Sequence, residues 1–472
     1  MTDTRIERDP LGELEVPASA LYGVQTERAR RNFPISGLKP LPAFVDAVIL
    51  IKKAAALTHR ETGRLDARLA DAIARAADEV LGGQHRDQFV VDVYQAGAGT
   101  SHNMNCNEVL ANRANELLGR KRGEYQPIHP NDHVNMAQST NDVIPTAIRL
   151  GALSRLAGLL GALDRLADAF AEKGRAFDHI MKSGRTHLQD ATPIRLGQEF
   201  AAYTGTIRRG RARIERSADD LRDLGIGGTA VGTGLNAEPQ YPTLMVKHLK
   251  ALTGLELRAG ADRVQLMQSL GDVAAFSGAL RAYAIDLNKI ANDLRLLASG
   301  PRTGFAEILL PAVQPGSSIM PGKVNPSIAE MVNQVCYQVM GNDQTVALAA
   351  EAGQLELNVM MPVIAHNLIF AMEILTSASA VLNERCVAGI QADEAACAHW
   401  LERSPAIVTA LAPKIGYAEA AKLAKEAVAK NVTVRQLVEE KGILKGKELE
   451  DILDYRKMTE LGVPGEGQSS AG

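Results

Sequence analysis

Apolar side chains recur every three to four residues along most of this 472-residue chain, which is the spacing of one face of an α-helix. The pattern begins near Pro42, where Phe44, Val48, Ile51 and Ala55 repeat with charged residues between them. Five longer segments without proline follow, at residues 151–182, 194–224, 243–300, 327–352 and 363–390. Segments of this length, rich in Ala and Leu and poor in aromatics, predict an all-α fold built around a bundle of long helices.

Changes in this pattern predict three domains, since a chain of this length is too long for one ordinary core. Residues 1–142 read as a mostly helical N-terminal domain and residues 143–396 as the central long-helix bundle. Residues 397–472 carry short, charged helical segments, at 417–430, 434–441 and 446–453, and read as a small C-terminal domain. Its end, GVPGEGQSSAG at 462–472, has the composition of a disordered tail.

One helical segment is apolar on more than one face. Its apolar positions are Leu287, Ile290, Ala291, Leu294, Leu296 and Leu297. They cannot all point into one narrow seam, so part of this surface is expected to pack against another copy of the chain. The alternative is a thicker core within one monomer.

Composition and charge limit the classes of partner. The hydrophobic fraction of 46% and charged fraction of 23% are globular values, and the formal net charge of −3 argues against a general binder of nucleic acid or anionic membranes. The N-terminus, MTDTRIERDP, is charged where a signal peptide would be apolar, and no uninterrupted apolar stretch of membrane-spanning length is evident. The four cysteines show no CxxC spacing. A cytoplasmic protein without disulfides is expected.

Four polar clusters interrupt the apolar pattern. They are Gly97–Asn105 (GAGTSHNMN), Asn135–Asn141 (NMAQSTN), Ser183–Asp190 (SGRTHLQD) and Gly316–Pro326 (GSSIMPGKVNP). Buried hydroxyls and amides are costly unless they are hydrogen-bonded. Each cluster alone reads as a helix cap or a turn. The four together, with a lysine and a histidine, predict a site for a small, highly oxygenated substrate.

The prediction of function depends most on the cluster at 316–326. Its two prolines forbid regular helix or sheet, so it is predicted to be a polar loop, and loops on rigid scaffolds commonly carry catalytic groups. It is not a P-loop, because five residues separate its glycines and Val324 stands where Ser or Thr would bind magnesium. Lys323 behind two serines favours an anion site over a surface turn.

GSSIMPGKVNP resembles the signature of the fumarase/aspartase superfamily, and the segments GRTHLQD, GTAVGTGLN and KIANDLRLLASGPR resemble its other shared blocks. The similarity runs from about Arg5 to Tyr455. Within the superfamily, GKVN indicates the branch of fumarate hydratases and aspartate ammonia-lyases. Ala98, Thr140, the Tyr22-Gly23-Val24 segment and AEAGQ at 350–354 favour the ammonia-lyase side, whereas Gly228 is the fumarase-like choice. Ala137, His102 and Met361 also depart from the usual pattern.

The resemblance implies elimination of ammonia from L-aspartate through a doubly charged aci-carboxylate. Hydrogen-bond donors aimed at its oxygens would supply the largest catalytic effect. By resemblance these donors are Thr100, Ser139, Thr140 and Ser318. Thr186, Lys323 and Asn325 would grip the other carboxylate.

The resemblance also assigns the proton-transfer groups. Ser317 is the expected base, acting as an alkoxide that loop N–H groups and Lys323 stabilise. Asn141 and His187 are expected near the amino group, with Glu330 orienting His187. The alternatives are structural. Ser317 would be a loop serine without a catalytic role, Lys323 a solvated cation and His187 a core histidine whose hydrogen bonds are satisfied.

No metal or other cofactor is predicted, because no His, Cys and carboxylate set has ligand spacing. The resemblance implies a homotetramer in which each active site takes residues from three chains. Class II fumarate hydratase is the nearest alternative function, and a non-catalytic helical scaffold is the other.

Overall fold

The computed structural model describes residues 3–465 and divides the chain into two compact units. The first comprises Met1–Gly161, Gly210–Ile285 and Val335–Thr376, and the second comprises Ala162–Arg209, Asp286–Gln334 and Ser377–Gly472. The three-domain division remains a prediction. The expected disordered tail from residue 466 onward lies outside the described residues.

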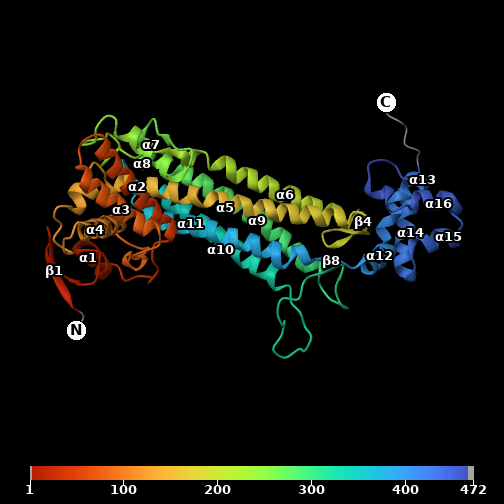
Figure 1. The fold of residues 1–472 in the computed structure, drawn as a ribbon. Coiled ribbons are helices and arrows are strands. Elements are labelled where there is room, and N and C mark those ends of the chain that lie inside the picture. The colour runs from red at the N-terminus through yellow and green to blue at the C-terminus, as the bar shows by residue number, and fades with distance from the viewer. Residues whose placement is uncertain (1–2, 466–472) are drawn as a thin grey trace. The chain divides into compact units, whose positions relative to one another are not determined.

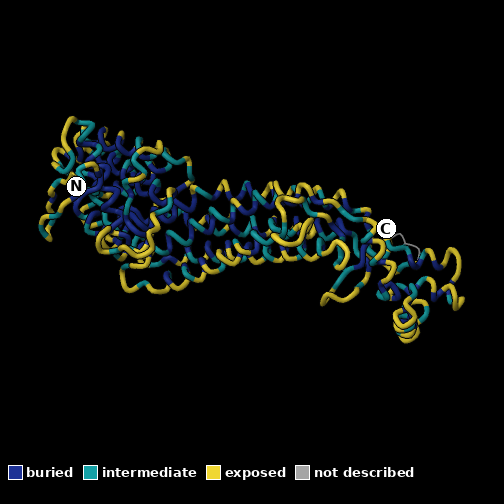
Figure 2. The backbone as a smooth tube through the Cα atoms, turned by 90° about the horizontal axis from the view of Figure 1, so that it is seen from below, coloured by how far each residue is buried: buried dark blue, intermediate teal, exposed yellow. Residues whose placement is uncertain are grey.

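The predicted all-α fold built on long helices is confirmed (Figure 1). The long helices are α5 (Thr140–Ala176), α6 (Leu196–Ser217), α9 (Gly271–Leu297), α10 (Ser327–Glu351) and α11 (Met361–Arg385). Buried and exposed positions alternate along them, as an amphipathic pattern requires (Figure 2). Sheet structure in the described residues is limited to four two-stranded pairs.

The predicted segment at 243–300 is not one helix. It contains α7 (Tyr241–Thr253), the short α8 (Arg263–Gln268) and then α9. Gly254 ends α7 in the left-handed conformation at φ +68°, and the Asp262 side chain caps α8 through the amide of Gln265. Proline is absent here, so the break comes from glycine and capping chemistry.

The first unit also contains the N-terminal hairpin of β1 (Thr4–Asp9) and β2 (Gly12–Pro17), together with α1 (Val24–Asn32), α2 (Pro42–Glu61), α3 (Ala67–Leu81) and α4 (Thr100–Leu117). Helix α2 packs against α3, α4 and α7. Apolar residues of α2 such as Val48 and Ile51 are fully buried in this core.

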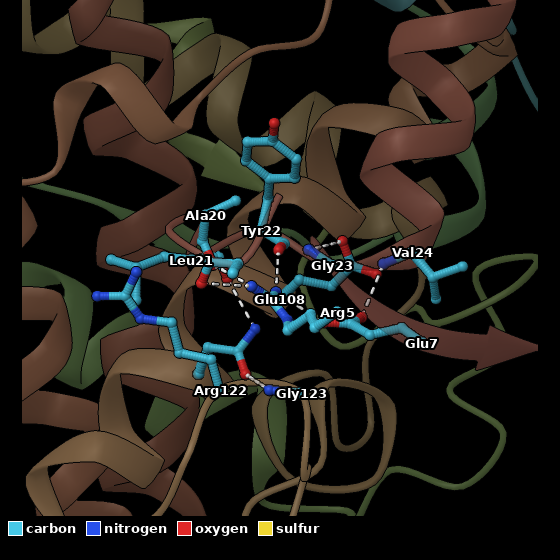
Figure 3. A network of polar contacts seen from close by, with 12 residues as sticks. Arg5, Glu7, Ala20, Leu21, Tyr22, Gly23, Val24, Glu108, Arg122 and Gly123 are labelled. Carbon is cyan, nitrogen blue, oxygen red and sulfur yellow. Dashed lines mark hydrogen bonds and ion pairs between the residues drawn. The ribbon is translucent and has the colours of Figure 1, made fainter. Parts of the chain in front are cut away.

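A polar network fixes the segment that enters α1 (Figure 3). The guanidinium of Arg5 donates to four carbonyl oxygens, those of Pro17, Ala18, Ala20 and Tyr22. From α4, the buried Glu108 carboxylate accepts hydrogen bonds from the amides of Gly23, Gln25 and Thr26. Two charged side chains thus satisfy backbone groups of this segment, and they anchor it to β1 through Arg5 and to α4 through Glu108.

The second unit contains the hairpin of β3 (Met181–Thr186) and β4 (Gln189–Arg195), the pair β7 (Ile308–Leu309) and β8 (Gln391–Ala392), and α12 (Glu394–Arg403). The short helices expected near the C-terminus are present as α14 (Tyr417–Lys430), α15 (Val434–Glu440) and α16 (Gly446–Ile452), and the unpredicted α13 (Ala412–Ile415) precedes them. They share a small apolar core that includes Leu401, Leu423 and Leu437.

Two segments, Thr140–Ala176 and Met361–Gly389, are long and apolar enough to cross a membrane by length and composition alone. Charged residues interrupt both segments, such as Arg149 and Arg155 in the first and Glu373 and Glu384 in the second. The apolar windows of these segments are 78% and 50% buried inside the protein, and the core helices of soluble proteins pass the same test.

Candidate active site

The predicted site residues fall into two groups, one in each unit. Thr100, Ser139, Thr140 and Asn141 belong to the first unit, and Thr186, His187, Ser317, Ser318, Lys323, Asn325 and Glu330 belong to the second. Each group has its own local architecture.

Thr100 is the first residue of α4 and is exposed. The polar cluster at 97–105 could be a helix cap or a turn by sequence, and the helix begins within it because left-handed Ala98 (φ +61°) and Gly99 (φ +89°) end the preceding turn. The amide of Ala98 also donates to the carbonyl of Val359 at 2.8 Å. This places the Thr100 hydroxyl at a helix N-terminus, where the helix dipole favours bound anions.

His102, which departs from the superfamily pattern, is a core residue. Its ring is fully buried and stacks on Phe44 with centroids 4.8 Å apart. Burial lowers the pKa of His102 to about 3, and the nearby Lys52 acts in the same direction. A histidine that stays neutral in the core has no acid–base role at neutral pH.

A buried lysine that the sequence reading missed lies beneath the segment carrying Ser139 to Asn141. Lys52 Nζ donates to Asn135 Oδ1 at 2.8 Å and to Gln138 Oε1 at 2.9 Å. Asn135 Oδ1 also accepts from Asn103 and Asn107 of α4, each at 3.2 Å. Burial lowers the pKa of Lys52 to about 7. This amide cluster joins α2, α4 and the turn before α5.

Asp142, also missed, fixes the same segment from the other side. The amide of Ser139 donates to Asp142 Oδ1 at 2.9 Å, and the amides of Gly227 and Thr229 donate to Oδ2 at 3.0 Å. Asn141 Nδ2 donates to the carbonyl of Ala230 at 2.8 Å. The GTAVGTGLN block, suspected from sequence only as a shared motif, therefore holds the hydroxyl-bearing turn in place.

In the second unit, Thr186 and His187 form the tip of the β3–β4 hairpin. Thr186 pairs with Gln189, so the turn has two residues, His187 and Leu188, with φ +56° and +59°. Two-residue hairpins favour this left-handed backbone, but they normally use Asn and Gly there. Here the turn carries an exposed histidine and an exposed leucine. Backbone strain of this kind clusters at functional sites.

The serine loop, residues 316–326, is closed at its base. The amide of Gly316 donates to the carbonyl of Lys323 at 2.7 Å, and Asn325 Nδ2 donates to the carbonyl of Gly316 at 2.7 Å. A Cβ at position 316 would lie 2.6 Å from the Lys323 carbonyl oxygen, which explains the glycine. Asn325, predicted as a substrate ligand, thus also has a structural contact within its own loop.

Within the serine loop, the Ser317 hydroxyl oxygen accepts hydrogen bonds from the amides of Ile319 (3.2 Å) and Met320 (2.9 Å). Ser318 and Lys323 are exposed. The Lys323 ammonium makes no hydrogen bond or ion pair with the described residues. An alkoxide at Ser317 would be stabilised by the two amide donors, and a free cation in the same loop could meet an anion.

Glu330 does not orient His187 within a single chain. Glu330 lies in the first turn of α10, and the described residues contain no hydrogen bond or ion pair between it and His187. Their pairing stays a prediction that requires a second chain.

Known proteins match this chain nearly end to end. A family model described as a lyase matches residues 12–341, and one described as the C-terminus of fumarase C matches residues 407–460. An aspartate ammonia-lyase from Bacillus sp is 49% identical over 98% of this chain and 99% of its own length. A class II fumarate hydratase from Halobacterium salinarum is 51% identical over 98% of each chain.

Among solved structures, a fumarate lyase:delta crystallin from Brucella melitensis bound to cobalt superposes with a TM-score of 0.93 at 51% identity, covering 97% of this chain and 100% of that one. The fold and the matches define a helical-bundle lyase. The chain belongs to the lyase family of the fumarase/aspartase superfamily, as its four motifs predicted.

Proposed function

We propose that this chain is an aspartate ammonia-lyase, which converts L-aspartate reversibly into fumarate and ammonia. The base removes a proton from Cβ, and the electron pair is held as an aci-carboxylate. It then forms the carbon–carbon double bond as the Cα–N bond breaks and ammonia leaves. Four of the similar curated proteins, from Bacillus and Pseudomonas, carry this name at 48–50% identity.

The observation that carries the proposal is the pair of amide hydrogen bonds to Ser317 Oγ. A serine is a poor base unless its alkoxide is stabilised, and the amides of Ile319 and Met320 already point at this oxygen. They are fixed by the loop backbone, so they need no reorganisation when charge develops. Lys323 adds a positive charge to the same loop.

The remaining roles follow from the superfamily resemblance. Thr100, Ser139, Thr140 and Ser318 would donate to the aci-carboxylate, and Thr186, Lys323 and Asn325 would bind the other carboxylate. Asn141 and His187 would lie beside the amino group, with Glu330 orienting His187.

We propose that three chains of a cytoplasmic homotetramer supply these groups to each site. Two properties of the single chain support this assembly. Among the described residues Glu330 and His187 share no hydrogen bond or ion pair, and apolar side chains such as Tyr337 (57% exposed) and Leu348 (55%) on α10 are exposed. The apolar positions at 287–297 that the sequence indicated for such an interface do not add support, because all of them except Leu296 (36% exposed) are buried within the chain itself.

Fumarate hydratase is the second candidate, because the Halobacterium relative has that name and Gly228 is the fumarase-like residue. The two reactions differ only in the leaving group. Purified protein should therefore be assayed for fumarate formation from L-aspartate and from L-malate side by side. Faster turnover of aspartate supports the proposal, faster turnover of malate replaces it with the hydratase, and turnover of neither favours the scaffold reading.

A further inference from the structure

The β3–β4 hairpin presents Thr186 and His187 in a strained turn whose tip is exposed. His187 and Leu188 both have positive φ, and residues 186–190 are all exposed. A strained backbone persists only where the surrounding structure over-determines it. The constraint on this turn must therefore come from the base of the hairpin.

The base of the hairpin contains a buried ionic cluster. Glu307 is fully buried, and its Oε1 accepts a hydrogen bond from Arg185 Nη1 at 2.9 Å. Its Oε2 forms an ion pair with Lys182 Nζ at 3.1 Å, and Lys182 Nζ also donates to Glu199 Oε1 of α6 at 2.8 Å. Both cations belong to β3, and Arg185 immediately precedes Thr186.

The backbone of Glu307 is also hydrogen-bonded through both its amide and its carbonyl. The amide of Glu307 donates to the carbonyl of Leu297 at the end of α9, and the carbonyl of Glu307 accepts from the amide of Asp393 before α12. The Arg185 guanidinium lies 3.9 Å from the centroid of the Phe305 ring. Arg185 is thus held by an ion pair with Glu307 and by a cation–π contact with Phe305.

Between the two cations, the strand pairing is irregular. The register shifts between Ser183 and Arg185, and a Cβ at Gly184 would lie 2.6 Å from the carbonyl oxygen of Thr192. Such a bulge re-aims the residues that follow it. Lys182 and Arg185, one on each side of the bulge, would pin its geometry through the shared carboxylate.

Stability alone gives a weak reason for this cluster. Burying charges such as those of Glu307 and Lys182 costs desolvation free energy, and apolar side chains of the same volume often stabilise a protein equally well. We propose that Glu307 is a positioning residue: through Lys182 and Arg185 it fixes the bulged strand so that Thr186 and His187 are held in place for the substrate. The inference rests on the proposed function for the identity of that substrate.

The test compares Glu307→Gln with a matched variant, Asp272→Asn. Asp272 pairs with the fully buried Arg149 at 2.7 Å in the first unit, so it offers an ion pair with a buried cation, and it is not one of the predicted substrate-binding residues. Loss of folded protein lowers the apparent kcat and leaves KM unchanged. A displaced hairpin changes KM.

For Glu307→Gln we expect kcat/KM for aspartate to fall by about tenfold to a hundredfold, with KM rising more than kcat falls. Glu307→Asp, which keeps the charge, should have a KM between those of the wild type and Glu307→Gln. Asp272→Asn should keep the wild-type KM. An unchanged KM in Glu307→Gln, or the same KM rise in Asp272→Asn, would overturn the positioning role.

Hydrogen exchange separates this inference from the proposed function. In Glu307→Gln the amides of residues 181–195 should exchange faster than in the wild type, and in Asp272→Asn they should not. If the wild type uses malate or no substrate, the proposed reaction fails while the exchange result still decides the role of Glu307. Unchanged exchange in Glu307→Gln refutes it.

Discussion

Replacing Asp142 by asparagine tests whether a buried carboxylate holds the hydroxyl-bearing turn. The wild-type carboxylate accepts three backbone amides, those of Ser139, Gly227 and Thr229. An asparagine amide offers one acceptor oxygen. If that oxygen stays with Gly227 and Thr229, the amide of Ser139 loses its partner, at a cost of about 1–3 kcal/mol.

The same substitution also removes an unfavourable free-energy term of similar size. Burial raises the pKa of Asp142 from 3.8 to about 6, so holding the charge at neutral pH costs about 3 kcal/mol, and asparagine removes this cost. Because the folded-state pKa is raised, the wild type loses stability as pH rises from 3.8 to about 6. About 1.5 kcal/mol of that loss falls between about pH 5 and about pH 8.

We therefore expect Asp142→Asn to have near wild-type stability at about pH 8 and to be less stable than wild type at about pH 5. Activity on aspartate should be lower at both values, because Ser139 is released. Thermal unfolding followed by circular dichroism, together with initial rates, measures both effects. A stability difference that is the same at the two pH values, or that favours the variant at the lower one, would refute the raised pKa. Full activity would refute the positioning of Ser139.

Three further predictions concern other parts of the chain. Burial lowers the pKa of Lys52 to about 7 in the folded protein, whereas an unfolded lysine titrates near 10.5, so the wild type gains stability as pH rises between these values. The advantage in stability of Lys52→Met over wild type should therefore shrink between about pH 7 and about pH 10. Thermal unfolding across this range measures the difference in stability, and a constant difference would contradict the lowered pKa. Leu188→Gly should raise the melting temperature by relieving about 1 kcal/mol of left-handed strain at an exposed position, and a lower value would show that the leucine packs against something. Mixing inactive Ser317→Ala and His187→Ala chains under subunit exchange should restore part of the activity if different chains supply these groups, whereas no recovery would argue for sites within one chain.

The sequence predicted the irregular loop at 316–326 and the polar cluster at 183–190 because both depend on local composition. Glycine, proline and hydroxyl residues at 316–326 predict an irregular loop, and Gly316 indeed stands where any Cβ would collide with the loop backbone. The C-terminal helices Tyr417–Lys430 and Val434–Glu440 were likewise predicted within one residue.

The supporting charges could not be found in this way, because their partners are distant in the chain. Lys52 and Lys53 look alike in sequence, yet Lys52 is buried against Asn135, 83 residues away, while Lys53 pairs with Asp78. Glu307 meets Arg185 across 122 residues. A pattern of periodic apolar positions places such charges on the solvent face by default.

In the proposed mechanism, the Ser317 hydroxyl removes the Cβ proton of L-aspartate. This step is tested most directly by the kcat of Ser317→Ala and Ser318→Ala with L-aspartate, measured as fumarate formation on folded protein. Ser317→Ala should lower kcat by about a hundredfold to ten-thousandfold with KM little changed, a larger loss in kcat than that of Ser318→Ala. A Ser317→Ala enzyme that retains wild-type kcat would show that Ser317 is not the base.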